Sequence, residues 1–96
     1  MSGREGIGTI KLYSRPGCHL CEGTSAALAE LVVGYPMLEV VEVNIELDDE
    51  MHARYLERIP LVEHCGEIQL ELDISKAQLE EFLARAARMT ADEPCD

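Results

Sequence analysis

Two cysteines separated by two residues, Cys18 and Cys21, form the pattern in this chain whose spacing best suits chemistry. The sequence around them changes from a turn-forming stretch with Pro16 and Gly17 to a run with helical periodicity. A cysteine at the start of a helix meets unpaired backbone N–H groups and the positive end of the helix dipole, which favour a thiolate over a thiol. A cysteine three residues later lies one turn along, within reach for a disulfide. The spacing therefore predicts Cys18 as a nucleophile and Cys21 as the resolving thiol.

Two basic side chains flank the first cysteine in the sequence. Arg15 precedes the turn, and we expect it to stabilise the thiolate or to hold a carboxylate of the substrate. His19 follows Cys18, where a protonated imidazole would also favour the thiolate; a solvated helix position is the equal alternative. Glu22 acts in the opposite direction, so the sequence leaves open whether the pair reduces or oxidises its substrate.

A metal site is the main alternative for the cysteine pair. Cys65 falls five residues beyond Pro60, about 16 Å further along if the intervening residues form a strand. Only Cys95 or a second subunit is then expected to complete a zinc or iron–sulfur site. Cys65 is otherwise predicted as a turn residue, with glutathionylation as its redox alternative, and Cys95 as a passive thiol or one that forms a mixed disulfide with Cys18. The candidate ligands beyond the pair are His19, His52, His64, Cys65 and Cys95.

Hydrophobic periodicity predicts the elements that must position these cysteines. Residues 9–13 alternate polar and apolar side chains, which predicts a short strand that leads into the turn. Residues 19–33 repeat apolar side chains at helical spacing and end at Gly34 and Pro36, which predicts a first helix. Residues 38–45 are rich in β-branched side chains and almost continuously apolar, as expected of a strand covered on both faces.

A second helix is predicted from Asp48, whose oxygens offer an N-cap. Its apolar face would hold Met51, Tyr55 and Ile59, which are spaced four residues apart. Pro60 is expected to end this helix because proline lacks the N–H that a helix interior requires.

The remaining pattern predicts a hairpin and a last helix. Residues 61–64 and 67–72 are predicted strands around the two-residue turn Cys65-Gly66. Ser75 and Gln78 form a capping box at the start of the last helix. The apolar face of that helix is predicted to hold Leu79, Phe82, Leu83 and Ala86.

This order of elements predicts an α/β domain with a mixed four-stranded sheet and helices on both faces. The first two strands are expected to be parallel with a right-handed helical crossover, and the hairpin adds antiparallel strands to the same sheet. We predict one domain over residues 1–96, with an ordered core at about 8–88 and a flexible acidic tail at 89–96.

Composition restricts the partners of the chain. Lys and Arg number 8 against 19 Asp and Glu, so the formal net charge is -11. Nucleic acids and anionic membranes select basic surfaces, so neither is an expected partner. The sequence shows neither a secretory signal nor a stretch approaching the roughly 20 apolar residues of a membrane span. We therefore expect a cytoplasmic monomer, in a compartment where cysteines are more often catalytic or metal-binding than structural.

The segment from Leu12 to Cys21 resembles the active-site segment of glutaredoxin-like proteins of the thioredoxin superfamily. The resemblance covers roughly residues 9–88 in element order and motif placement, and it is nearest to a group of small bacterial glutaredoxin-like proteins. It implies a glutaredoxin-type βαβαββα fold and thiol–disulfide oxidoreductase activity without a resident cofactor. In this superfamily a cis-proline opens the third strand and faces the cysteine pair. The resemblance assigns that role to Pro60, and it implies that Ile59 offers backbone groups to a bound peptide or thiol.

The resemblance leaves the reductant open. Glutathione-using members usually carry Thr-Val-Pro before the third strand and Gly-Gly after the fourth, where this chain has Arg58-Ile59-Pro60 and Leu72-Asp73. Asp73 and the start of the last helix would hold a glutathione carboxylate through backbone N–H groups. The expected reductant is therefore glutathione, a reductase or a partner protein. The expected substrate is a disulfide-containing protein or a glutathione mixed disulfide.

Two functions from different classes follow from these patterns. The first is thiol–disulfide exchange by the Cys18–Cys21 dithiol. The second is a thioredoxin-fold binding module without turnover, which would attract a basic partner through its negative charge and would hold zinc or an iron–sulfur cluster through the same cysteines.

Overall fold

A four-stranded mixed sheet of strand order β2-β1-β3-β4 forms the centre of the fold. The structure is a computed structural model that describes residues 8–89. The β1 strand is parallel to β2 and antiparallel to β3, and β4 is antiparallel to β3, so the predicted mixed α/β sheet is confirmed. The elements are β1 (Thr9–Ser14), α1 (His19–Leu31), η1 (Val32–Gly34), β2 (Glu39–Asn44), η2 (Ile45–Leu47), α2 (Asp49–Tyr55), β3 (Leu61–His64), β4 (Glu67–Glu71) and α3 (Lys76–Met89).

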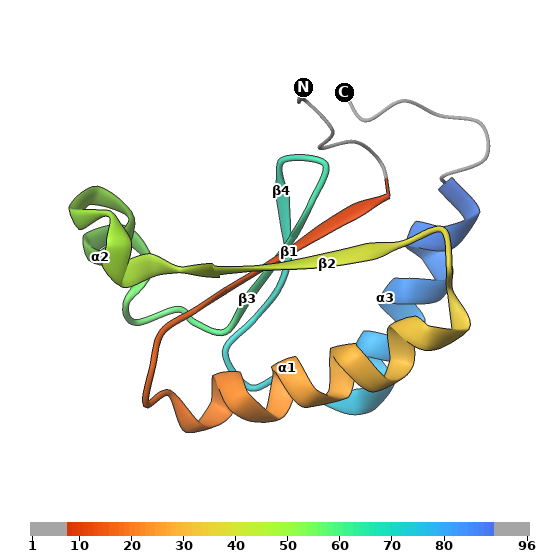
Figure 1. The fold of residues 1–96 in the computed structure, drawn as a ribbon, viewed down its shortest axis with the longest axis horizontal. Helices are drawn as coiled ribbons and strands as arrows, with labels where there is room; N and C mark the ends of the chain where they lie inside the picture. The colour runs from red at the N-terminus through yellow and green to blue at the C-terminus, as the bar shows by residue number, and fades with distance from the viewer. Residues whose placement is uncertain (1–7, 90–96) are drawn as a thin grey trace.

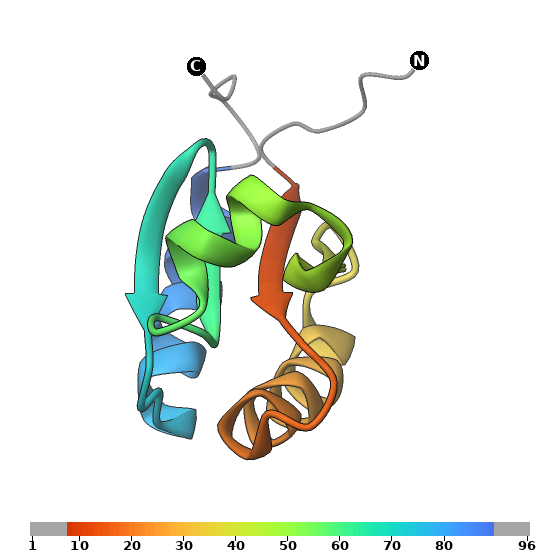
Figure 2. The same cartoon turned by 90° about the vertical axis from the view of Figure 1, so that its left-hand side faces the viewer.

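The two faces of the sheet are covered by different helices (Figures 1 and 2). Because side chains alternate along a strand, Ile10 and Leu12 of β1 point to the face that α1 and α3 cover, whereas Tyr13 points to the α2 face. The first face carries the larger apolar cluster, which includes Leu28 of α1 and Leu83 of α3. The second cluster, under α2, contains the cysteine pair and therefore belongs to the candidate site.

The β2 strand differs from the prediction of a strand covered on both faces. Among the described residues it is an edge strand, hydrogen-bonded in the sheet only to β1, and its residues are all half-buried or exposed. Val41 is exposed on this edge despite its apolar side chain. Its β-branched composition correctly predicted a strand. Its place in the sheet depends on the β3–β4 hairpin, which pairs with the other side of β1 and leaves β2 at the edge.

The second helix is shorter than its apolar pattern predicted. Asp48 caps it as expected, since its carboxylate accepts hydrogen bonds from the N–H groups of Glu50 and Met51. The helix ends at Tyr55, so the prediction that Ile59 belongs to its apolar face is wrong. Ile59 is nevertheless buried, because the turn after α2 brings it back under the same cluster.

The hairpin and the last helix follow their local signals. Cys65 and Gly66 have φ values of 56° and 80°, the left-handed backbone that two-residue type I′ hairpin turns require. Ser75 Oγ accepts the Gln78 N–H at 3.1 Å, and Gln78 Oε1 accepts the Ser75 N–H at 2.8 Å, which completes the predicted capping box. The predicted apolar face is buried in full at Leu79, Phe82, Leu83 and Ala86.

The predicted acidic tail lies almost wholly outside the described residues. Met89, which the sequence placed in that tail, is the last residue of α3, and Cys95 is among the residues that the structure does not describe. Within residues 8–89, no helix has both the length and the apolar character that a membrane crossing needs.

Candidate redox site

The turn between β1 and α1 places Cys18 at the start of the helix. The N–H of Cys18 donates to the carbonyl oxygen of Arg15 at 3.3 Å and closes the turn. Pro16 suits the second position of such a turn because its φ is fixed, and Gly17 takes the left-handed φ of 83° at the third. The sequence Arg-Pro-Gly-Cys thus reverses the chain in four residues.

Cys18 is the N-cap residue of α1, as the sequence predicts. Its extended backbone, with φ of -86° and ψ of 107°, precedes the helix, and its carbonyl oxygen accepts the Glu22 N–H at 3.0 Å. Its Sγ accepts the backbone N–H of Cys21 at 3.1 Å. One of the N–H groups that a helix start leaves without an intrahelical partner is therefore aimed at the Cys18 sulfur.

The two cysteines form a disulfide but differ in their surroundings. Their Cα atoms are 5.2 Å apart, within the usual range for a disulfide. Cys21 is 2% exposed and belongs to the apolar cluster under α2. Cys18 is half-buried and lies at the margin of that cluster. A reagent approaching from solvent therefore meets the Cys18 sulfur first.

The segment before β3 joins the same cluster. Ile59 packs with Cys21 and Tyr13 and is buried, and the Ile59–Pro60 peptide bond is cis. The carbonyl oxygen of Pro60 accepts the N–H of Leu72 at 2.8 Å. The fold thus brings Ile59 together with the cysteines, and the hydrogen bond from Leu72 fastens the loop after β4 to the neighbouring Pro60.

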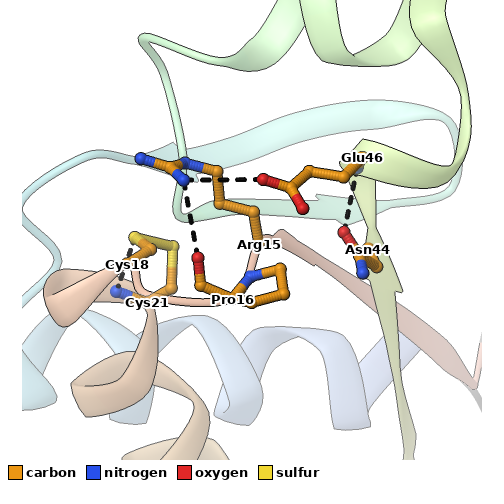
Figure 3. Close-up of polar contacts among 6 residues, drawn as sticks. All are labelled: Arg15, Pro16, Cys18, Cys21, Asn44 and Glu46. Carbon is orange, nitrogen blue, oxygen red and sulfur yellow. Dashed lines mark hydrogen bonds and ion pairs between the residues drawn. A yellow bond between two sulfur atoms is a disulfide. The ribbon is translucent and has the colours of Figure 1, made fainter.

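Arg15 is held by an acidic partner that sequence reasoning missed. Its Nη1 lies 3.5 Å from Glu46 Oε2 and donates to the carbonyl oxygen of Pro16 at 3.5 Å (Figure 3). Asn44 Oδ1 in turn accepts the Glu46 N–H at 2.9 Å and caps the short helix that carries it. Glu46 follows the carboxyl end of β2, which is adjacent and parallel to β1, and this relationship was the available signal.

A second arginine near the site was also missed. Arg58 stands two residues before Pro60, and its Nη2 and Nε contact Glu71 Oε1 at 2.6 and 3.0 Å. Its guanidinium also lies 6.0 Å from the centre of the Tyr55 ring. Since Glu71 ends β4, this contact connects the segment before β3 to the hairpin.

Two predicted site residues lie further into solvent. The His19 side chain is fully exposed, and its Nδ1 is 3.9 Å from Glu22 Oε1. The structure thus places the His19 side chain in solvent beside Glu22. Asp73 is exposed in the loop between β4 and α3, next to Leu72. The tuning role of His19 and the ligand-binding role of Asp73 remain predictions.

The described part of the chain does not gather a metal site. Over residues 8–89, no cluster of three or more His, Cys, Asp or Glu side chains could hold a metal ion. Cys65 and the buried His64 lie at the end of β3 that is remote from Pro60, as the strand length predicted. Cys95 lies outside the described residues.

Comparison with known proteins decides the family. The model of the Glutaredoxin-like domain (DUF836) matches residues 9–84, which include β1, the cysteine pair and most of α3. The chain belongs to this glutaredoxin-like family. The comparison with curated proteins gives no significant match.

Solved structures show that this glutaredoxin-like domain has a thioredoxin fold. It is similar to protein XcR50 from X. campestris, with 27% identity and a TM-score of 0.65 over 79% of this chain and 96% of that one. Protein Ne2328 from Nitrosomonas europaea has 22% identity and a TM-score of 0.63, over 77% of this chain and 88% of that one. Oxidised thioredoxin O2 from Arabidopsis thaliana has 17% identity and a TM-score of 0.60, over 80% of this chain and 72% of that one. The last two likenesses concern the fold alone.

Proposed function

We propose that this glutaredoxin-like domain is a thiol–disulfide oxidoreductase in which Cys18 attacks the substrate and Cys21 resolves the intermediate. The observation that carries the proposal is the asymmetry of the pair. Cys18 is half-buried at a helix N-cap and its sulfur accepts the Cys21 N–H, whereas Cys21 is 2% exposed among apolar side chains. The first environment favours a reactive thiolate, and the second protects the resolving thiol from solvent.

The exchange proceeds in two balanced steps. The Cys18 thiolate attacks one sulfur of a substrate disulfide, so a Cys18 mixed disulfide forms and the other substrate sulfur leaves as a thiolate. Cys21, after losing its proton, attacks the Cys18 Sγ and releases the second substrate thiolate. Two electrons pass to the substrate, and the product is the Cys18–Cys21 disulfide present in the structure. A reductant thiol returns the pair to the dithiol by the reverse chemistry.

The surroundings of the pair support a substrate that is a disulfide-containing protein or a glutathione mixed disulfide. Ile59 lies in the same cluster as the cysteines, and the hydrogen bond from Leu72 to Pro60 keeps the Asp73 loop beside that segment. A peptide or a glutathionyl group would lie along these two adjoining backbone segments. Arg15 offers a cation at the turn, although Glu46 competes for it. We propose a cytoplasmic monomer that uses no resident cofactor, with glutathione, a reductase or a partner protein as the reductant.

The test is reduction of a glutathionylated peptide and of a disulfide-bonded protein by the full chain. Cys18→Ser is expected to abolish both reactions, because no other sulfur occupies the N-cap. Cys21→Ser is expected to trap a mixed disulfide on Cys18, visible as an added mass that a reductant removes. The matched control is the double variant Cys65→Asn/Cys95→Ser, which lacks the cysteines outside the pair and is expected to keep wild-type rates.

Two results would oppose the proposal. Full activity of Cys18→Ser would exclude Cys18 as the nucleophile. A wild-type chain that turns over neither substrate, and whose Cys18 alkylates no faster than Cys21, would favour the binding module instead. Zinc or visible absorbance in such a sample would identify that module as a metal-holding one.

A further inference from the structure

The segment that precedes β3 packs beside the buried cysteine, although it belongs to no helix or strand. It comprises Arg58, Ile59 and Pro60, between the end of α2 at Tyr55 and the start of β3. Ile59 is 6% exposed and lies in the same apolar cluster as Cys21, which is 2% exposed. If this segment moved outward, Cys21 would lose one of the neighbours that bury it.

Arg58 joins the outer side of this segment to the hairpin. Its Nη2 and Nε lie 2.6 and 3.0 Å from the same oxygen, Oε1 of Glu71, which is the last residue of β4. Two donors of one planar guanidinium fix the geometry of this contact better than a single donor would. The two side chains are 41% and 39% exposed, so solvent moderates the strength of the pair.

The backbone closes the same junction at a second point. The N–H of Leu72, the residue after Glu71, donates to the carbonyl oxygen of Pro60 at 2.8 Å. Leu72 has a φ of 67°, a left-handed conformation that is unfavourable for a residue with a Cβ. Such a conformation persists only where surrounding contacts hold it. The hydrogen bond to Pro60 and the adjacent Arg58–Glu71 pair are contacts of this kind.

Aromatic side chains connect Arg58 to the cluster around Cys21. The Arg58 guanidinium lies 6.0 Å from the centre of the Tyr55 ring, and the centres of the Tyr55 and Tyr13 rings are 5.1 Å apart. Tyr13 belongs to the cluster that contains Cys21 and Ile59. The N–H of Arg58 also donates to the carbonyl oxygen of Tyr55 at 2.8 Å. Arg58 therefore contacts both the end of α2 and the end of β4.

We propose that Arg58 is a positioning residue that, through its ion pair with Glu71, keeps Ile59 packed against Cys21 and so closes the Cys21 thiol to external reagents. Outward movement of the 58–60 segment would be a local opening of the fold, because its contacts with the hairpin are separate from the strand pairing of the sheet. Loss of the ion pair makes that opening more frequent.

The closed segment directs thiol–disulfide exchange to Cys18. A reductant thiolate attacks the Cys18 Sγ of the oxidised pair, forms a mixed disulfide and releases Cys21 as a thiolate. A second reductant thiolate attacks the reductant sulfur of that mixed disulfide and releases Cys18 as a thiolate. One reductant disulfide forms, and the pair gains two electrons. This role in exchange rests on the proposed oxidoreductase function, whereas closure of the segment does not.

Alkylation of Cys21 tests the closure in the reduced Cys18→Ser chain, where Cys18 does not compete. Arg58→Gln and Glu71→Gln are each expected to raise the rate with iodoacetamide roughly twofold to fivefold, the range set by a partly exposed ion pair. Arg58→Lys keeps the charge without the two-donor geometry and is expected to lie between Arg58→Gln and the parent. Timed quenching and mass mapping of Cys21 give the rates.

The direction of the two changes separates opening from a charge effect. A nearby positive charge favours a thiolate, so charge alone would make Arg58→Gln slower and Glu71→Gln faster. Opening makes both faster. The double variant Arg58→Gln/Glu71→Gln is expected to react no faster than the faster single variant, because both substitutions remove the same contact. Opposite directions, or unchanged rates in both single variants, would overturn the proposal.

Ser75→Ala is the matched control for overall stability. It removes a cap of α3 and leaves the Arg58–Glu71 pair intact. If Cys21 reacts through local opening, this variant is expected to keep the parent rate, and low urea is expected to change that rate little, because a local opening exposes little surface. A rate that rises about fivefold in Ser75→Ala, or steeply with urea, would assign the reaction to global unfolding and overturn the proposal.

The activity assay distinguishes this inference from the proposed function. A chain that reduces neither test substrate, yet gives the expected Cys21 rates, would contradict the oxidoreductase and retain the closing role of Arg58. A chain that reduces both substrates, with Cys21 rates unaffected by Arg58→Gln and Glu71→Gln, would retain the oxidoreductase and overturn the closing role.

Discussion

The backbone N–H of Cys21 donates to the sulfur of Cys18 at 3.1 Å, so the proposed resolving residue supplies a hydrogen bond to the proposed nucleophile. The donor is one of the N–H groups that the start of α1 leaves without a carbonyl partner. It needs no further side chain and is present whenever the helix is formed. The helix start therefore supplies a donor that would stabilise a Cys18 thiolate.

Alkylation of the reduced chain is expected to modify Cys18 first. Cys18 is half-buried at the N-cap, whereas Cys21 is 2% exposed in an apolar cluster. We expect Cys18 to react with iodoacetamide at least roughly tenfold faster at neutral pH, because the thiolate is the reactive form. Timed quenching and mass mapping of singly modified protein measure the ratio. Equal alkylation rates, or a faster reaction of Cys21, would show that the assignment of Cys18 as the nucleophile is wrong.

Glu46→Gln is expected to make Cys18 more reactive. The Glu46 carboxylate lies 3.5 Å from the Arg15 guanidinium and offsets its positive charge at the turn. Removal of that negative charge favours the Cys18 thiolate, so alkylation of Cys18 at neutral pH is expected to become faster. Both side chains are about 40% exposed, so the rate gain at neutral pH is expected to stay below about fivefold.

Glu50→Gln is the matched control for that change. It removes one negative charge from the same acidic segment, but its carboxylate pairs with Arg54 within α2 at 3.1 Å. We expect no change in the rate of Cys18 alkylation from this variant. If both variants raise that rate equally, general net charge and not the contact with Arg15 is responsible. High salt is expected to reduce the effect of Glu46→Gln, because exposed charges are screened.

Ser75→Ala is expected to destabilise the fold through the capping box of α3. Ser75 Oγ accepts the N–H of Gln78 at 3.1 Å, and alanine leaves that N–H without its partner. Loss of such an N-cap typically destabilises by about 1 kcal/mol. For a domain of this size the expected decrease in Tm is roughly 4 to 8 °C, measured by circular dichroism. Ser75→Asp retains an oxygen acceptor and is expected to melt close to wild type.

Leu83→Ala is expected to destabilise far more than Leu47→Ala. The Leu83 side chain is fully buried between α3 and the sheet, so alanine leaves a cavity there. Core truncations of this kind lower the free energy of unfolding by about 2 to 5 kcal/mol, a large share of the stability of a small domain. Leu47, at 84% exposure, is expected to change it by less than about 0.5 kcal/mol. Urea unfolding midpoints distinguish the two, and similar midpoints would contradict the assigned core.

Signals that act over a few residues correctly predicted most of the local structure. Pro16-Gly17 predicted the turn before the helix, the Ser75-Gln78 box predicted the start of α3, and Cys65-Gly66 predicted the hairpin turn. Each of these features depends on a backbone preference or on a hydrogen bond within four residues, so the local sequence is enough to predict it. The placement of Cys18 at an N-cap belongs to the same class.

The sequence by itself therefore determined the order of elements, the turns, the caps and the position of the cysteine pair at the start of α1. Only the tertiary structure decided that β2 is an exposed edge strand and that Ile59 lies outside the helix yet is buried beside Cys21. It also decided that Glu46 forms an ion pair with Arg15. These relationships join residues far apart along the chain. They depend on which strands pair and on how α2 packs over the sheet, and short-range periodicity contains no information about either choice.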